Sequence, residues 1–266
     1  MTTTLVTGAT DGIGKETARQ LLARGHEVIL HGRNAARLEA TRAALSQALP
    51  NARLQTVQGD LASLASVREL AARVPDIDVL VNNAGIYANE PSLTVDGFES
   101  TFAVNHLAPF LLTHLLLARL RPGGRVVNVS SVAHTRGKLA PRTWRSLVGY
   151  DDYAAYAESK LANVLFTVEL ARRLPTGLTT YALHPGVVST KLLTEGFRMR
   201  GSDSLAAGAE TSVYLASEPG IEAHSGQYFV RKRPAKAHAL AGDAAATRDF
   251  YVECAALVGI DPLEAR

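Results

Sequence analysis

A tyrosine and a lysine stand four residues apart in the run Tyr156-Ala-Glu-Ser-Lys160, within a stretch of helical periodicity. Residues at this spacing share one face of a helix, with their Cβ atoms roughly 5 to 6 Å apart. A free phenol has a pKa of about 10, so proton exchange near neutral pH needs a nearby cation that favours the phenolate. The pair is therefore suited to acid–base chemistry, although the same spacing is common on solvated helix faces and is weak by itself.

A second pattern is a glycine-rich turn, Thr7-Gly8-Ala9-Thr10-Asp11-Gly12-Ile13-Gly14, which follows the first apolar run and opens the first helical stretch. Gly8 allows a sharp turn, Gly12 lets backbone N–H groups approach a pyrophosphate, and Gly14 lets the helix pack closely on the strand. A flexible strand-to-helix turn also contains glycines. The position of this turn in the first strand–helix unit favours dinucleotide binding.

The end of the second expected strand bears on the choice between NAD and NADP. NAD-binding proteins place a carboxylate there, about 20 residues after the glycines, to bind a ribose hydroxyl. This chain instead reads His31-Gly32-Arg33-Asn34. Arg33 is suited to bidentate pairing with a 2′-phosphate, although a solvated arginine before a helix is the ordinary alternative. The missing acid favours NADP(H).

The bulk composition limits the classes of protein to consider. The chain has 266 residues, 47% of them apolar, which is enough for one large core, and we expect a single domain over 1–266. A net charge of +3 without a basic block argues against nucleic acid as a partner. The one cysteine, Cys254, excludes an intramolecular disulfide, and the eight histidines show no metal-ligand spacing, so we expect no metal.

The apolar segments give no sign of export or membrane insertion. Met1 to Leu5 runs directly into a strand pattern and leaves no room for the two regions of an export signal. The most apolar stretch, Pro109 to Leu120, is interrupted by polar residues and is too short to span a bilayer core of ~30 Å. We therefore expect a cytoplasmic protein without a membrane anchor.

Short apolar runs alternate with longer stretches in which apolar residues recur at three and four. The expected strands are Thr3 to Thr7, Glu27 to His31, Leu54 to Val57, Val79 to Asn82, Arg125 to Ser130, Leu178 to Leu183 and Gln227 to Val230. The expected helices are Gly14 to Ala23, Ala35 to Leu49, Ser63 to Arg73, Phe98 to Leu120, Ala154 to Leu174 and Ser204 to Ser217. Right-handed crossovers place such helices on both faces of a parallel sheet. The order predicts an α/β, Rossmann-type doubly wound fold with a seven-stranded, mostly parallel sheet.

Two segments do not fit this alternation, an insertion at 134–153 and a segment at 191–203. Both follow the carboxyl ends of late strands, where open α/β sheets bind their ligands. Long loops at such places are often functional. We expect a substrate-side insertion and a lid segment.

The spacing Gly-x3-Gly-x-Gly resembles the short-chain dehydrogenase/reductase family rather than the commonest dinucleotide fingerprint. Other motifs of that family follow in order at strand ends: Asn82-Asn83-Ala84-Gly85, then Asn128-Val129-Ser130-Ser131, then His184-Pro185-Gly186-Val187-Val188-Ser189-Thr190. Such ordered agreement from Thr7 to Thr190 is far more specific than any single motif. It also strengthens the catalytic interpretation of Tyr156 and Lys160.

The resemblance implies catalytic roles for Asn105, Ser131, Tyr156 and Lys160. Tyr156 would exchange the proton, Ser131 would hold the substrate carbonyl, and Asn105 would help relay protons through water. Strand alternation puts Ser130 and Ser131 on opposite faces but does not decide which faces the substrate. The alternative is that the Asn105 side chain is satisfied locally within its helix.

The glycine turn and the resemblance together predict a cofactor site. Asp60 and Leu61 resemble the family's adenine-contacting pair, although Asp60 close to Ser63 is also suited to capping a helix. The predicted cofactor-binding residues are Gly8, Thr10, Asp11, Gly12, Ile13, Gly14, Arg33, Asn34, Asp60, Leu61, Asn83, Ala84, Gly85, Tyr156, Lys160, Pro185, Gly186, Val188 and Thr190.

The long spacing between Ser131 and Tyr156, the run Ser159-Lys-Leu-Ala-Asn163 and the run Ser225-Gly-Gln-Tyr-Phe229 resemble the retinol dehydrogenase and protochlorophyllide reductase branch of the family. The absence of an N-terminal anchor is instead typical of its soluble bacterial ketoreductases. The lid segment carries Leu192, Leu193, Phe197 and Met199, which suit a greasy or aromatic carbonyl compound. A surface helix packed by the same residues is the alternative.

The sequence thus predicts an NADP(H)-dependent oxidoreductase that moves hydride between nicotinamide and a hydrophobic alcohol, ketone or aldehyde. A nucleotide-sugar epimerase-like enzyme shares the glycine turn and the Tyr-x3-Lys pair, but typically needs a larger region after Thr190. A non-catalytic dinucleotide sensor would keep the glycines and lose the catalytic set. Family members often pair through the helices near Asn105 and Tyr156, which leaves a homo-oligomer open.

Overall fold

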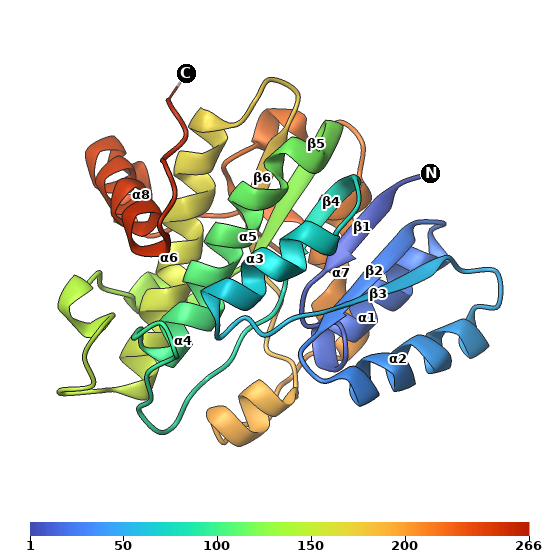
Figure 1. Ribbon diagram of the computed structural model, residues 1–266, viewed down its shortest axis with the longest axis horizontal. Coiled ribbons are helices and arrows are strands. Elements are labelled where there is room, and N and C mark those ends of the chain that lie inside the picture. The colour runs from blue at the N-terminus through green and yellow to red at the C-terminus, as the bar shows by residue number, and fades with distance from the viewer. Residues whose placement is uncertain (266) are drawn as a thin grey trace.

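An open sheet of eight strands runs through the computed structural model, which describes residues 1–265 (Figure 1). Its order is β3-β2-β1-β4-β5-β6-β7-β8, with β1 to β7 parallel and β8 antiparallel to β7. The strands are β1 (Thr3–Val6), β2 (Glu27–Gly32), β3 (Leu54–Gln58), β4 (Ile77–Asn82), β5 (Leu120–Val129), β6 (Thr179–His184), β7 (Tyr228–Val230) and β8 (Arg233–Pro234). The prediction of a doubly wound, mostly parallel sheet is confirmed.

The predicted number of seven strands is wrong, because the sheet has an eighth, β8. A two-residue turn joins β7 to β8, and both turn residues have left-handed backbones, Arg231 with φ 48° and Lys232 with φ 64°. Glycine, asparagine or aspartate usually occupies such positions in tight hairpins. Because arginine and lysine occupy these two positions here, the sequence does not indicate a hairpin.

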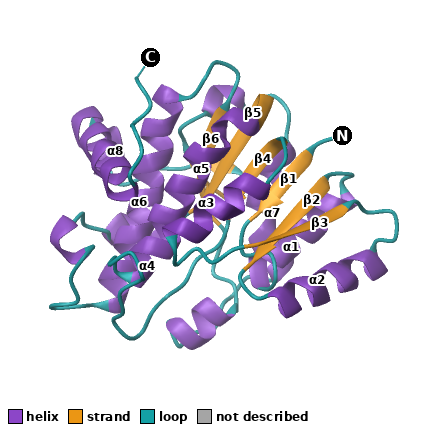
Figure 2. Ribbon diagram, in the orientation of Figure 1, coloured by secondary structure: helices purple, strands orange, loops and turns teal. Residues whose placement is uncertain are grey.

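Helices cover both faces of the sheet (Figure 2). They are α1 (Gly12–Ala23), α2 (Ala35–Ala48), α3 (Leu64–Arg73), α4 (Ser100–Phe102), α5 (Ala108–Leu116), α6 (Asp152–Arg173), α7 (Leu205–Ser217) and α8 (Ala244–Val258). One core contains residues of α3, α5, α6 and α8, and the other contains residues of α1, α2 and α7. Neighbouring strand residues enter opposite cores, Leu5 the first and Val6 the second. Burial on both faces explains why these strands are apolar without alternation.

The helix expected from Phe98 to Leu120 is divided. A π-helical turn, Ala103–Leu107, separates α4 from α5, and a 3₁₀ turn, Leu117–Arg119, ends the stretch. The stretch Ser100–Arg119 is long and apolar enough to cross a membrane by composition, with a mean hydropathy of 1.4. However, 78% of its most apolar window is buried inside the fold, so core packing accounts for its apolar character.

Helix α8 was not predicted, and it covers the outer face of α5 and α6 (Figure 1). The Tyr251 hydroxyl lies 2.6 Å from His114 Nε2 on α5, and Cys254 Sγ lies 3.3 Å from His106 Nε2. Helix α8 therefore covers part of the two helices near Asn105 and Tyr156, and a homo-oligomer remains an open prediction.

Candidate active site

A cavity of about 1020 Å³ opens at the carboxyl edge of the sheet, lined by the loops that follow β1, β2, β4, β5 and β6. Every residue predicted for the cofactor site lines it, together with Ser131. Parallel strands explain this convergence, because their carboxyl ends meet at one edge. Asn105 is fully buried and does not line the cavity.

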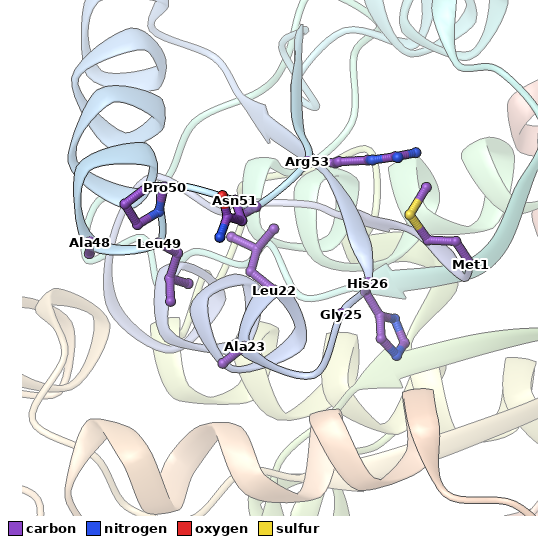
Figure 3. A pocket seen from close by; sticks show the side chains of 11 residues that line it. Met1, Leu22, Ala23, Gly25, His26, Ala48, Leu49, Pro50, Asn51 and Arg53 are labelled. Atoms are coloured by element: carbon purple, nitrogen blue, oxygen red, sulfur yellow. The ribbon is translucent and has the colours of Figure 1, made fainter.

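A smaller cavity of about 390 Å³ lies at the opposite edge, where β2 and β3 begin (Figure 3). Leu22, His26, Leu49 and Arg53 are among its lining residues. None of the predicted site residues reaches it. The larger cavity is therefore the candidate active site.

The glycine turn is held against the loop that follows β4. The Thr7 hydroxyl accepts hydrogen bonds from the backbone N–H groups of Asn83 and Ala84, both at 3.0 Å. The Asn83 side chain donates to the Thr7 carbonyl oxygen at 2.8 Å. Gly8 and Gly12 have φ values of 65° and 54°, which favour glycine. The turn is rigidly placed at one end of the cavity.

We expect Gly14→Ala to destabilise the protein, because a Cβ atom at Gly14 would lie 2.3 Å from both Asn83 Nδ2 and the Gly8 carbonyl oxygen. Overpacking of this kind costs roughly 1–3 kcal/mol, which lowers the Tm of a domain this large by several degrees. Gly242→Ala is the matched control, since a Cβ atom there meets open space. Thermal unfolding followed by circular dichroism compares the two, and equal Tm values would contradict the tight packing at Gly14.

His31 braces the turn from β2. Its Nδ1 accepts a hydrogen bond from the Gly8 N–H at 3.2 Å, and its Nε2 lies 3.1 Å from the carbonyl oxygen of Gly59, to which it donates. Burial lowers the pKa of His31 to about 4. The imidazole is therefore neutral at physiological pH and supports the turn without adding charge.

The part of the cavity that borders the end of β2 carries two arginines, Arg33 and Arg37. Arg37 was not predicted; it lies in the first turn of α2, where the Asn34 side chain accepts a hydrogen bond from its backbone N–H at 2.9 Å. Its guanidinium pairs with Asp11 at 3.0 Å, and Lys191 of the lid segment lies 3.5 Å from the same carboxylate. The negative charge of Asp11 is thus balanced by the nearby cations Arg37 and Lys191.

Of the two interpretations of Asp60, the structure agrees with a place in the cavity wall and not with the N-cap of α3. Asp60 lines the cavity, and its carboxylate accepts a hydrogen bond from the Ala62 N–H at 3.0 Å. The N-cap of α3, however, is Ser63, whose hydroxyl accepts from the Ser66 N–H at 3.3 Å. Asp60 therefore shapes the turn before the cap.

At the other end of the cavity, helix α6 carries Tyr156 and Lys160, whose exposed fractions are 6% and 3%. Lys160 Nζ lies 5.5 Å from the centre of the Tyr156 ring and donates to the Val129 carbonyl oxygen at 3.1 Å. Burial lowers the pKa of Lys160 to about 8. Burial also raises the pKa of Tyr156 to about 12, although a hydrogen bond with Ser131 opposes that rise. At neutral pH the phenol is a proton donor beside a cation.

The structure separates the two serines that end β5. The Ser130 hydroxyl is buried and donates to the Lys160 carbonyl oxygen at 2.7 Å, so it ties the strand to α6. Ser131 lines the cavity, and its hydroxyl is hydrogen-bonded with Tyr156. Only Ser131 is placed to touch a molecule in the cavity.

Asn105 lies behind the wall of the cavity, in the π-helical turn. Its side chain accepts from the Ile86 N–H at 2.7 Å and donates to the Ile86 carbonyl oxygen at 2.9 Å and to the Ser159 hydroxyl at 3.0 Å. The Asn105 carbonyl oxygen accepts from Asn163 Nδ2 at 3.0 Å. These contacts join the loop after β4 to α6 and so place that helix relative to the sheet.

The insertion at 134–153 is only partly a wall of the cavity. Thr135, Arg136 and Tyr153 line it, whereas Trp144 lies in the core and stacks on Phe102 at a centroid distance of 4.5 Å. Trp144 Nε1 donates to Glu158 at 2.7 Å, and burial raises the pKa of that carboxyl group. The tryptophan anchors the insertion to α6.

The lid segment borders the same cavity. Leu192, Leu193, Phe197 and Met199 line it. Its base is joined by two hydrogen bonds, from the Val187 N–H to Asp203 at 2.7 Å and from the Gly201 N–H to Ser189 at 2.8 Å. The apolar residues of the segment therefore pack over the cavity and not on a distant surface.

Comparisons of the sequence and of the structure with known proteins indicate the same family as the sequence motifs do. The profile of the short chain dehydrogenase family matches residues 2–201. Retinol dehydrogenase 12 of Bos taurus is 43% identical over 240 residues, which cover 85% of this chain and 76% of that protein.

Two solved structures share the fold. The crystal structure of an uncharacterized protein from Mycobacterium paratuberculosis has a TM-score of 0.83 and 36% identity, covering 99% of this chain and 96% of that one. A short chain dehydrogenase from Burkholderia cenocepacia in complex with NADP has a TM-score of 0.69 and 29% identity, covering 85% of this chain and 94% of that one. The chain therefore belongs to the short-chain dehydrogenase/reductase family, in its retinol dehydrogenase-like branch.

Proposed function

We propose that this protein is an NADP(H)-dependent oxidoreductase that interconverts an apolar alcohol and the corresponding ketone or aldehyde. One observation carries the proposal: Ser131, Tyr156 and Lys160 share a single cavity with the glycine turn and with Arg33. A dinucleotide that spans such a cavity brings its phosphates to one end and its reactive ring to the other. We further propose that residues 1–266 act as one catalytic domain.

The residues present fit NADP(H). Gly8 and Gly12 line the cavity, and a Cβ atom at Gly8 would lie 2.9 Å from Ala84 Cα, so glycine is needed for the turn to pack on the loop after β4. Arg33 and Arg37 line the neighbouring part of the cavity and would hold a 2′-phosphate. No carboxylate follows β2 to bind a free ribose hydroxyl. The Burkholderia relative in complex with NADP supports this assignment.

When bound, the nicotinamide supplies hydride for reduction and accepts it for oxidation. The Tyr156 phenol, protonated at neutral pH because its pKa is raised to about 12, donates its proton to the carbonyl oxygen as the alcohol forms. The Ser131 hydroxyl, already hydrogen-bonded with Tyr156, orients that oxygen. The Lys160 cation stabilises the phenolate that remains. Asn105 acts as a positioning residue, and oxidation reverses these steps.

A direct assay tests the proposal. Loss of the NADPH absorbance band is followed with a series of hydrophobic ketones and aldehydes, and its appearance with the corresponding alcohols. We expect NADPH-dependent turnover of apolar carbonyl compounds. Tight NADPH binding without any turnover would favour a dinucleotide sensor instead.

Lys160→Met is expected to raise stability while lowering activity. The pKa of Lys160 falls from an ordinary 10.5 to about 8 in the folded chain because burial disfavours its charge. The unfolded chain therefore binds more protons between these values, so stability rises with pH across that window and the cost of the buried cation is fully present below pH 8. We expect the variant to be about 1–3 kcal/mol more stable at pH 7.

Urea unfolding at pH 7 and above pH 10.5 measures this difference, which should vanish at the higher pH as the wild-type lysine loses its charge. The Val129 carbonyl oxygen keeps a second donor, Asn163 Nδ2 at 3.4 Å, so the substitution leaves no orphaned acceptor. A variant less stable than wild type at pH 7 would show that Lys160 is not a destabilising buried cation.

A further inference from the structure

Three aromatic rings from separate elements meet beside the catalytic phenol. Phe197 of the lid segment lies 4.1 Å from Tyr87, which follows β4, and 5.1 Å from Tyr156, measured between ring centroids. The Phe197 ring is tilted by 45° to the first and stands edge-on to the second at 87°. Tyr87 and Tyr156 lie 5.4 Å apart. The ring of Phe197 thus fills a benzene-sized position against two aromatic walls.

The two walls are firmly held. Tyr156 lies within α6, and the Tyr87 hydroxyl is hydrogen-bonded to Asp152 in the first turn of the same helix. Burial and this carboxylate both raise the pKa of Tyr87, so its hydroxyl remains a donor. Asn89 Nδ2 donates to Asp152 at 3.4 Å.

Phe197 belongs to a different segment from the two walls. In the lid segment its backbone N–H donates to the Leu192 carbonyl oxygen at 3.3 Å, and the preceding Gly196 carbonyl oxygen accepts from Asn89 Nδ2 at 2.9 Å. The next residue, Arg198, has a φ of 54°, a conformation that is unfavourable for a residue with a side chain. The Phe197 ring covers Tyr156, which is only 6% exposed. A substrate ring that packs against Tyr87 and Tyr156 would take the position that Phe197 now holds.

We propose that the substrate carries an aromatic or conjugated ring beside its carbonyl group, and that this ring takes the place of Phe197 against Tyr87 and Tyr156. This inference rests on the proposed function and narrows its substrate class. Aromatic pairs in tilted or edge-on geometry gain stabilisation beyond the area that they bury. A saturated ring of the same size would gain only the buried area.

Two ketones with the same bicyclic carbon skeleton test the proposal: 1-tetralone, whose second ring is aromatic, and 1-decalone, which is saturated. The readout is the ratio of their kcat/KM values with NADPH. We expect Tyr87→Leu to lower this ratio about tenfold, the upper range for loss of one aromatic pair. Tyr87→Phe, which keeps the ring, should preserve it, as should Glu195→Ala, an exposed change in the lid segment. An unchanged ratio in Tyr87→Leu would overturn the proposal.

Phe197→Ala gives an independent test, because it empties the ring position. The KM for 1-tetralone should fall several-fold while the dissociation constant for NADPH stays unchanged. An increased KM would mean that Phe197 is part of the binding wall and does not occupy the substrate's place.

Calorimetric binding separates failure of this inference from failure of the proposed function. Tyr156→Phe keeps the ring wall and removes the proton donor, so its NADPH complex should still bind 1-tetralone more tightly than 1-decalone without turnover. Equal affinities would overturn the aromatic site even if wild-type turnover depends on Tyr156. Persistent turnover by this variant would overturn the catalytic assignment alone.

Discussion

Replacing Tyr156 with phenylalanine is expected to lower kcat for ketone reduction about 10²- to 10⁴-fold, the usual contribution of a positioned general acid. The substitution removes one oxygen from a side chain that is 6% exposed and leaves its ring in place. Because Lys160 keeps its hydrogen bond to the Val129 carbonyl oxygen, the cofactor end of the cavity should be undisturbed. Single-turnover NADPH oxidation measures the chemical step, and fluorescence titration measures NADPH affinity.

Tyr214→Phe provides the control for loss of a phenolic hydroxyl. Tyr214 lies on α7 and packs against Phe229 in the core on the other face of the sheet. The Tyr214→Phe variant should retain the wild-type rate of turnover. If Tyr156→Phe also retained full kcat, the proton would have to come from another group, and the proposed mechanism would be wrong.

The second large effect is expected at the phosphate-binding end, where Arg33→Asp should shift the ratio of specificity constants from NADPH toward NADH by about 10²-fold. The change removes a charge-assisted pair with the 2′-phosphate and places a repelling carboxylate in its position. Arg37 would still contact the 2′-phosphate but replaces Arg33 only in part, because its guanidinium is shared with Asp11 at 3.0 Å. The measurement is kcat/KM for each cofactor with one saturating ketone.

Arg42→Asp is the matched charge reversal on α2. Arg42 pairs with Glu39 on the exposed side of that helix and does not line the cavity. Its reversal should leave the cofactor ratio unchanged, which separates a local effect from a general change of surface potential. An unaltered NADPH preference in Arg33→Asp would show that the 2′-phosphate binds elsewhere.

Much of the site was predictable because a doubly wound sheet brings the ends of its parallel strands to one edge. Residues as distant in sequence as Gly8, Asn83 and Pro185 therefore line one cavity. Arg37 was missed because an arginine in the first turn of a helix is usually solvated, and nothing nearby in sequence shows that this turn borders the cavity. The choice between Ser130 and Ser131 depended on which side of β5 the helix α6 covers.

Other features gave no local signal. The hairpin that adds β8 has arginine and lysine at its left-handed positions, so the usual turn residues are absent. Trp144 lies in an insertion expected to face the substrate, yet its stacking on Phe102 and its hydrogen bond to Glu158 make it part of the core. The role of helix α8 follows from the tertiary structure, in which its buried residues pack in the same core as α5 and α6.

The sequence by itself determined the alternation of strands and helices up to β7, the glycine turn and the shared helix face of Tyr156 and Lys160, because each depends on residues near one another in the chain. Only the tertiary structure decided the properties that depend on distant neighbours. Burial sets the pKa values of Tyr156 and Lys160 at about 12 and about 8, and the lid segment brings Phe197 against Tyr87. Burial is a property of the packed molecule, which no short stretch of sequence contains.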